Sequence, residues 1–296
     1  MPSLKEVRTR IESVRSTQQI TSAMKMVAAS KLRRAQLAIL KLRPYAAKMN
    51  EILHDISSSI EDSSENIYSR QREITHVLLI PVSSNRGLCG AFNSNIIKHT
   101  IQHIHSQYGD QFQKGNLDLL SIGKKGSDFF IKNNYKVIER FDSIFDEMSF
   151  ENVVPLANIL IDNFLQNKYD KIEIIYNQFK NAAVQIITVE AFLPVRSDFG
   201  ERKGSSKNHV NYLFEPGKEQ IIDELIPKIL KVHIYKALID SLASEHGARM
   251  TAMHQASDNA GEILQELKLS YNKARQASIT NEILEIVSGA EALKGM

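Results

Sequence analysis

The 296-residue chain has one cysteine, no tryptophan, and few residues that interrupt regular structure, with 13 glycines and 7 prolines. A single cysteine excludes a disulfide framework and a metal site built from several cysteines, and it is typical of a reducing compartment. The longest apolar run, Val77 to Val82, is far shorter than the roughly 20 residues that a bilayer-spanning helix needs. The N-terminal residues have no apolar core, so no secretory signal peptide is expected. The scarcity of glycine and proline predicts few turns and long, uninterrupted elements.

Glycine and charge are both distributed unevenly. No glycine precedes Gly87, which predicts an unbroken element in the N-terminal part. The net charge is only +3, but residues 1–50 carry 11 Lys and Arg against 2 Asp and Glu, a local net charge of +9. A segment this basic predicts an acidic partner, which could be nucleic acid, an anionic membrane or acidic protein loops.

The N-terminal segment has apolar residues at alternating spacings of three and four, from Leu4 to Ile60. Of the 17 positions in this repeat 14 are apolar, which is typical of a left-handed coiled coil. The three polar exceptions are Gln18, Thr21 and Lys25. Beside them the apolar stripe moves sideways to Ile20, Met24 and Val27. We therefore predict a helix of about 55 residues within a segment 1–60, at 1.5 Å per residue about 80 Å long, and expect the polar stretch to face something other than the partner helix.

The same spacing returns after the helix-breaking residues Glu215-Pro216-Gly217. It runs from Ile222 to Ser278 and then slips by one residue, as at a stutter in a coiled coil. This pattern predicts a second helix, of about 75 residues, within segment 217–296. Two long amphipathic helices at opposite ends of one chain can pair antiparallel. The simplest role of such a pair is a structural hairpin.

Residues 74–193 change period, because short apolar strand-like segments alternate with helical ones. The strands are expected at 74–82, 117–122, 135–141, 171–176 and 183–193, and the helices at 91–107, 124–133 and 150–167. This alternation predicts a Rossmann-like α/β domain with a mainly parallel sheet. The short link before the last strand predicts a hairpin, and residues 194–216 are expected to form a linker.

The glycine-rich segments of this domain do not match a nucleotide-binding fingerprint. The segment from Asn85 to Asn93 is neither G-x-G-x-x-G nor a P-loop, and Gly123-Lys-Lys-Gly126 lacks the leading glycine and the Ser or Thr after the lysine. Gly87 and Gly90 are explained more simply by a tight turn from strand to helix. A small ligand at the switch point of the sheet remains an alternative.

Histidine and cysteine also give no catalytic constellation. His99 and His103 have the i, i+4 spacing of a zinc pair, but they lie opposite a predicted apolar face of Ile97, Ile101 and Ile104, so we expect solvated surface there. Cys89 has no base at a fixed spacing and is expected to be buried. We therefore predict no catalytic residue, no cofactor and no metal.

Three sequence blocks resemble one known family. Residues 20–31 read Ile-Thr-Ser-Ala-Met-Lys-Met-Val-Ala-Ala-Ser-Lys, and residues 86–93 read Arg-Gly-Leu-Cys-Gly-Ala-Phe-Asn. A C-terminal block runs from Ala248-Arg-Met through Asp258-Asn-Ala to residues 271–290. In this order the blocks resemble the gamma subunit of F-type ATP synthases over essentially the whole chain. The C-terminal block is the most specific, because a generic coiled coil would not reproduce it.

The resemblance implies a non-catalytic rotor in the central stalk. The terminal helices would form an antiparallel coiled coil inside a ring of three alpha and three beta subunits, and the α/β domain would stand with the epsilon subunit on the c-ring. Proton-driven rotation of the c-ring would then cycle the catalytic sites of the beta subunits for ATP synthesis or hydrolysis. Acidic loops of the beta subunits would explain the basic segment without nucleic acid.

The family's motifs also imply residues that touch the stator. These are Met24, Lys25, Arg249, Arg275, Gln276, Thr280 and Glu282. The chloroplast branch of the family has a regulatory cysteine pair, which a chain with Cys89 alone cannot form. The resemblance further implies a bacterial chain at the cytoplasmic face of the inner membrane, associated with the membrane only through the complex.

Two other functions are considered. A coiled-coil scaffold without ATPase partners would self-associate through its heptads. A nucleotide-binding α/β enzyme with helical extensions would bind a ligand in its middle domain, and the missing phosphate fingerprint argues against it.

Overall fold

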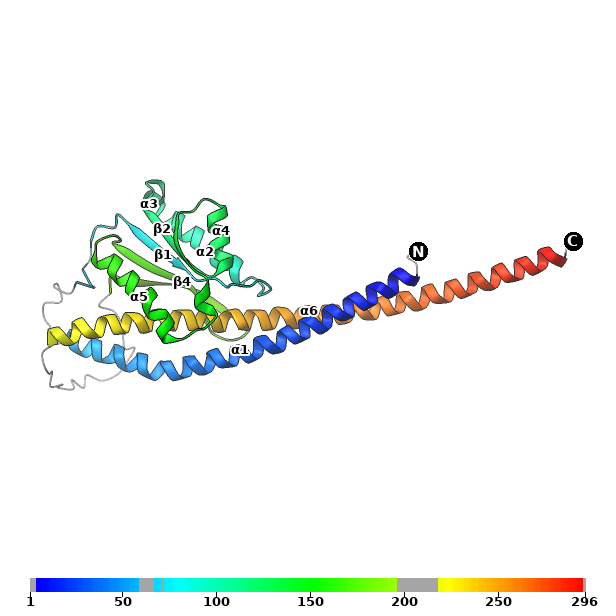
Figure 1. Ribbon diagram of the computed structural model, residues 1–296, viewed down its shortest axis with the longest axis horizontal. Coiled ribbons are helices and arrows are strands. Elements are labelled where there is room, and N and C mark those ends of the chain that lie inside the picture. The colour runs from blue at the N-terminus through cyan, green and yellow to red at the C-terminus, as the bar shows by residue number, and fades with distance from the viewer. Residues whose placement is uncertain (1–3, 59–66, 71, 196–217, 295–296) are drawn as a thin grey trace. The chain divides into compact units, whose positions relative to one another are not determined.

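The computed structural model describes residues 4–58, 67–70, 72–195 and 218–294 (Figure 1). The N-terminal helix α1 (Leu4–Ser58) has 55 residues and the C-terminal helix α6 (Lys218–Lys294) has 77, as the heptad spacing predicts. Both continue through an internal proline. Most of the predicted linker, residues 196–216, lies outside the described part. None of the described helices has the length and apolar character that crossing a membrane requires.

The chain divides into two compact units, residues 1–28 with 250–296, and residues 29–249. In the first unit, α1 and α6 pair antiparallel, because Gln18 and Thr21 contact Ser257, whereas the later residue Lys25 contacts the earlier residue His254. The buried side chains of this pair lie at heptad positions. They are Val7, Ala28, Met253, Ala260 and Leu264. The predicted antiparallel pairing is therefore confirmed within this unit.

The sequence predicts that the polar stretch of α1 faces something other than the partner helix. This prediction is wrong, because the stretch lies in the seam between α1 and α6. The Thr21 hydroxyl lies 2.7 Å from the Ser257 hydroxyl, and the Lys25 ammonium lies 3.2 Å from His254 Nδ1. Polar residues of α1 thus meet polar residues of α6 at the same level of the seam, so their hydrogen-bonding groups satisfy one another. The sideways apolar residues Ile20 and Val27 are the ones left exposed, at 57% and 58%.

The second unit contains one five-stranded sheet in the order β3-β2-β1-β4-β5. Its strands are β1 (Val77–Pro81), β2 (Leu117–Ile122), β3 (Val137–Phe141), β4 (Lys171–Phe179) and β5 (Gln185–Leu193). The first four are parallel, and β4 and β5 form the predicted antiparallel hairpin. The mainly parallel α/β sheet is confirmed.

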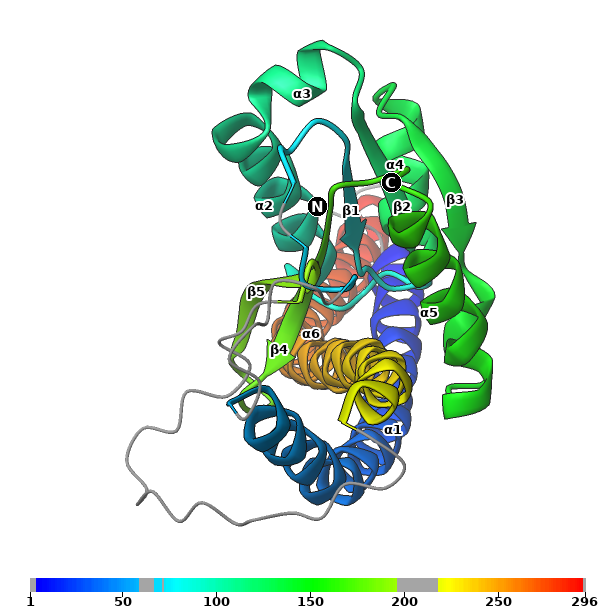
Figure 2. The same ribbon diagram turned by 90° about the vertical axis from the view of Figure 1, so that its left-hand side faces the viewer.

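Helices cover both faces of this sheet (Figure 2). The helices of this part are α2 (Phe92–Gln107), α3 (Gly109–Gln113), α4 (Lys124–Lys132) and α5 (Phe150–Leu165), with a 3-10 turn at Ser143–Phe145. One face packs against α5, the N-terminal part of α6 and Met49 of α1. The other packs against α2 and α4. Because alternate residues of a strand point to opposite faces, Leu78 and Ile80 enter the first core and Val77 and Leu79 enter the second.

The buried face of α2 differs from the predicted one. Its fully buried members are Phe92, Ile96, Thr100 and Ile104. Ile97 and Ile101 flank this face on one side, and His99 and His103 flank it on the other. The expectation that the two histidines are solvated surface is therefore wrong, since the His103 side chain is 15% exposed and contacts Glu173 of β4.

Candidate functional site

The predicted contact residues on the first unit are accessible in the chain, although to different degrees. Met24 and Lys25 are half-buried on α1, whereas Arg275, Gln276, Thr280 and Glu282 are exposed on α6. Among them the Thr280 hydroxyl donates to the carbonyl of Gln276, and Glu282 accepts from Ser278. Large apolar side chains lie along the same stretch of α6 and are about half exposed or more. These are Ile279, Ile283, Leu284, Ile286 and Val287.

Arg249, the last residue of the second unit, is held differently from the other predicted contacts. It is only 8% exposed. One guanidinium nitrogen donates to the Glu245 carboxylate and lies 3.3 Å from His246 Nδ1. The other donates to the backbone carbonyls of Arg86 and Gly87, at 3.0 and 3.3 Å. These bonds connect Arg249 both to the preceding turn of α6 and to a backbone segment of the α/β part.

The segment that receives these bonds is the tight turn between β1 and α2, residues 84–90. Asn93 at the start of α2 fastens it, because its side-chain oxygen accepts from the Ser84 amide and its nitrogen lies 3.3 Å from Cys89 Sγ. Cys89 is 1% exposed, as expected, and burial raises the pKa of its thiol. Gly90 has a φ of 58° and Leu88 a φ of 61°, so one glycine of the predicted pair has the left-handed backbone, and Leu88 rather than Gly87 has the other. The turn holds the Leu88 side chain 63% exposed.

His246 is the titratable group whose charge is most clearly suppressed in this cluster. Burial, and then the positive charges of Arg249 and Lys31, lower its pKa to about 4 from 6.5. The neutral ring can accept a hydrogen bond, which fits its position beside the Arg249 guanidinium.

A histidine with a lowered pKa makes the fold sensitive to acid. The unfolded chain binds the proton first, so we expect the free energy of unfolding to fall as the pH drops from 6.5 to 4, by up to about 3 kcal/mol from this group. His246→Gln should remove that part of the pH dependence in urea titrations of the full chain, and the exposed His105→Gln is the control. Burial raises the pKa of Asp240 to about 6, so protonation of this carboxyl stabilises the fold as the pH falls. This opposite contribution is the same in both variants. An unchanged pH profile in His246→Gln would contradict the assignment.

The N-terminus of α4, the helix that follows β2, is occupied by the chain's own atoms. The amides of the first turn of α4 donate to Asn85 Oδ1, to the Ser84 carbonyl and to the Ser83 hydroxyl, at 2.8–3.1 Å. Those N–H groups are the ones that bind anions at a helix N-terminus. The segment Gly123-Lys-Lys-Gly126 is thus explained by its close approach to Ser83 rather than by a phosphate: a Cβ on Gly123 would lie 2.2 Å from the Ser83 carbonyl oxygen.

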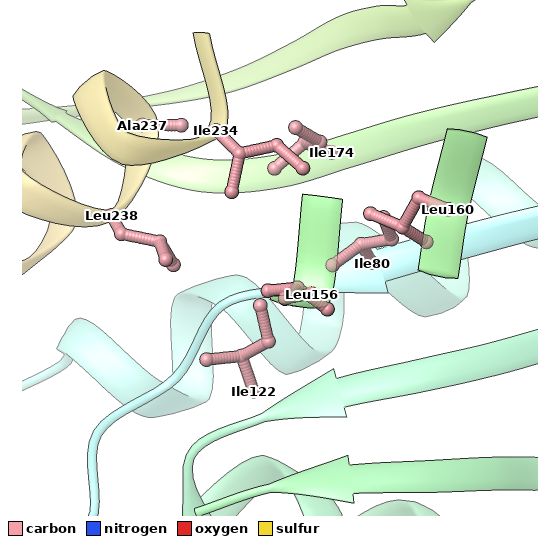
Figure 3. A pocket seen from close by; sticks show the side chains of 8 residues that line it. All are labelled: Ile80, Ile122, Leu156, Leu160, Ile174, Ile234, Ala237 and Leu238. Carbon is pink, nitrogen blue, oxygen red and sulfur yellow. The ribbon is translucent and has the colours of Figure 1, made fainter. Parts of the chain in front are cut away.

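The interior between the sheet, α5 and α6 is filled with aliphatic side chains. Figure 3 shows eight aliphatic side chains that point toward one another from β1, β2, β4 and both helices. The space among them does not hold a water molecule. Within the part of the chain that the structure describes, no group of three His, Cys, Asp or Glu side chains is arranged to hold a metal ion.

Two buried polar clusters were missed by the sequence reasoning. Glu173 of β4 lies 2.7 Å from His103 Nε2 and 2.8 Å from the Lys171 ammonium. Glu190 of β5 accepts from the Tyr176 hydroxyl at 2.7 Å and lies 2.6 Å from His233 Nε2 of α6. A glutamate inside a strand-like apolar segment was the available signal, because such a residue is rarely buried unless it is paired.

Comparison with known proteins covers the whole chain. The sequence profile of the family described as "ATP synthase" matches residues 3–293. The ATP synthase gamma chain of Flavobacterium johnsoniae is 55% identical over 295 residues, covering all of both chains. That of Cytophaga hutchinsonii is 51% identical over 293 residues and 99% of each chain.

Solved structures agree in fold. A chain of the Tetrahymena thermophila mitochondrial ATP synthase central stalk and c-ring is 26% identical, with a TM-score of 0.59, over 80% of this chain and 99% of that one. A chain of the Euglena gracilis mitochondrial ATP synthase has a TM-score of 0.67 at 20% identity, over 98% and 94% of the two chains. The long terminal helices and the parallel sheet therefore occur together in these proteins as they do here. The chain belongs to the family of ATP synthase gamma chains.

Proposed function

We propose that the chain is the rotor of the central stalk of an F-type ATP synthase. It transmits the rotation of a proton-driven c-ring to the catalytic beta subunits, which make or hydrolyse ATP. The observation that carries this proposal is the match to gamma chains from end to end, at 51–55% identity, in a chain whose two terminal helices are both long. A scaffold protein would share the helices but would have no reason to share the whole sequence.

The partners follow from this role. The alpha and beta subunits surround the paired helices, the epsilon subunit and the c-ring bind the α/β part, and the membrane is reached only through the complex, at the cytoplasmic face of the bacterial inner membrane. The basic segment 1–50 suits acidic protein loops, so no nucleic acid is needed. The chain itself does no chemistry, and the N–H groups at the start of α4, which could bind an anion, donate to residues 83–85 instead.

The stator contacts belong to the first unit. Met24 and Lys25 on α1, with Arg275, Gln276, Thr280 and Glu282 on α6, have accessible side chains there. Exposed apolar residues accompany the four polar ones on α6, so this stretch offers a partner both hydrogen-bonding groups and apolar area. Arg249 is separated from this set, because its guanidinium is buried and bonded within the chain.

The test is native mass spectrometry of the detergent-solubilised complex that contains this chain. We expect one copy with three alpha and three beta subunits. Zero-length carbodiimide cross-linking of the same complex should join Lys25 to carboxylates of the beta subunits. Lys171, whose side chain is 18% exposed and paired with Glu173 of its own chain, is the control that should give no cross-link to another subunit.

Two outcomes would count against this assignment. A homodimer or filament without ATPase subunits would overturn the rotor function in favour of a scaffold. Cross-links of Lys25 confined to its own chain would leave the rotor function standing and overturn the contact assignment.

A further inference from the structure

Apart from the chain connection between β5 and α6, forces on the α/β part reach α6 through non-covalent contacts, and few of these contacts are directional. The interface with the sheet is mainly aliphatic, as the side chains in Figure 3 illustrate. Apolar contacts are non-directional, so they resist separation better than sliding. Hydrogen bonds fix a position, because they weaken steeply when their angle is lost. The bonds from α6 to the α/β part are therefore the places where relative movement is resisted.

Arg249 makes the bond from α6 to the turn between β1 and α2. Its guanidinium reaches two successive backbone carbonyls, those of Arg86 and Gly87, and it is itself oriented by Glu245, one helical turn earlier. The side chains of Arg249 and Glu245 are 10% and 9% exposed, so water competes little for these bonds. A planar guanidinium is suited to this task, because its donors leave in fixed directions, whereas an ammonium is a point charge.

Among the described residues, the other side-chain bonds of the turn that Arg249 holds come from the α/β part itself. Ser84, Asn85 and Asn93 bond it to α2, to α4 and to Asp142. Ser84 also donates to the Arg86 carbonyl that Arg249 uses, so the two bonds share one acceptor. Within the described part of the chain, the hydrogen bonds from α6 to this turn come from Arg249, which is also the last residue of the second compact unit.

On these grounds we propose that Arg249 is a positioning residue that ties the 84–90 turn to α6, so that the helix and the α/β part rotate together. The proposal rests on the proposed rotor function. It differs from a stator contact, because the acceptors of Arg249 lie within the same chain. It also predicts which segment responds when the residue is changed.

The experiment uses the assembled complex carrying Arg249→Gln, with hydrogen exchange followed by mass spectrometry and ATP-driven proton pumping per ATP hydrolysed. We expect amides of the 84–93 segment to exchange at least tenfold faster, since a charge-assisted bond has been removed, and the pumping ratio to fall at least twofold. Lys228→Gln is the matched control, because it removes an exposed i, i+4 ion pair of the same helix. It should change neither quantity.

Further variants separate the proposal from its alternatives. Arg249→Lys keeps the positive charge but lacks the several fixed N–H donors of a guanidinium. We therefore expect the faster exchange of residues 84–93 and the lower pumping ratio to persist in this variant. If this lysine restores pumping while the turn still exchanges fast, a direct charge contact with the stator explains the role and the proposal is overturned. Faster exchange throughout residues 72–195 would indicate general destabilisation and would also overturn it. If Arg249→Gln fails to assemble, the double variant Arg249→Gln, Glu245→Gln avoids an unpaired buried carboxylate and gives the same readouts.

The experiment distinguishes a failure of the rotor function from a failure of the proposed role of Arg249. A wild-type complex that lacks alpha and beta subunits, or does not pump, would refute the rotor function. The exchange of the 84–93 segment would still report whether Arg249 ties the turn. A wild-type complex that pumps, with an Arg249→Gln variant equal to it in both readouts, would refute the tie alone.

Discussion

Gly123→Ala is expected to destabilise the α/β part of the chain by about 3–5 kcal/mol, the sum of an overpacking cost and a backbone strain cost. Gly123 has φ 94° and ψ 136°, a conformation that residues with a Cβ rarely adopt. An added Cβ would also lie 2.2 Å from the Ser83 carbonyl oxygen, which belongs to the backbone and cannot rotate away. The measurement is the urea midpoint of the full chain.

Gly115→Ala separates the two causes of this effect. Gly115 also has a positive φ, 73°, but a Cβ there would meet nothing within 4 Å. We expect it to lose only about 1–2 kcal/mol, the cost of a left-handed backbone for an L-residue. Equal losses at the two positions would mean that the contact between Gly123 and Ser83 contributes nothing.

Gly123 also shows which features of the α/β part could be predicted from the sequence and which could not. The segment Gly123-Lys-Lys-Gly126 lacks the P-loop pattern, and in the structure the amides at the start of α4 donate to residues 83–85. The sequence could not reveal why Gly123 is required, because the reason is its close approach to the Ser83 carbonyl, 40 residues earlier in the chain. Every residue has a backbone carbonyl, so the sequence does not show which carbonyl a distant residue contacts. The same holds for Arg249, whose acceptors are the carbonyls of Arg86 and Gly87.

Periodicity, by contrast, predicts the elements well. The heptads of α1 and α6 give helix lengths close to the observed ones, because the spacing of apolar residues is a local property of a helix. The alternating pattern also predicts the five strands, and the short link between β4 and β5 predicts their antiparallel hairpin. The predictions were wrong where they concerned which face of a helix is buried. The predicted stripe of Ile97, Ile101 and Ile104 shares only Ile104 with the buried face of α2, and this offset put His99 and His103 on the wrong side.

The polar layer in the helix pair was misread for a related reason. Gln18, Thr21 and Lys25 interrupt the heptads of α1, and taken alone they suggest a surface turned elsewhere. Their counterparts on α6 are Ser257 and His254. Only the register of the two helices, which a single sequence does not give, brings these residues together.

Glu173→Ala is expected to cost about 3–5 kcal/mol at pH 7, the usual loss when one partner of a buried ion pair is removed. The Glu173 residue is 5% exposed, and its carboxylate bonds to both the Lys171 ammonium and the His103 ring. The variant leaves the Lys171 ammonium, 18% exposed, without its carboxylate. Glu139→Ala, at an exposed site of β3, is the control and should change stability by less than about 0.5 kcal/mol.

The pH dependence of this loss tests its electrostatic origin. Burial alone would raise the pKa of Glu173, but the bonds from His103 and Lys171 outweigh it and lower the pKa to about 2 from 4.5. The ionised carboxylate therefore stabilises the fold fully above pH 4.5, and this contribution is lost as the pH falls toward 2. The difference in unfolding free energy between wild type and Glu173→Ala should then shrink between pH 5 and pH 3. A difference that stays constant over this range would show that Glu173 acts by packing its methylene groups rather than by its charge.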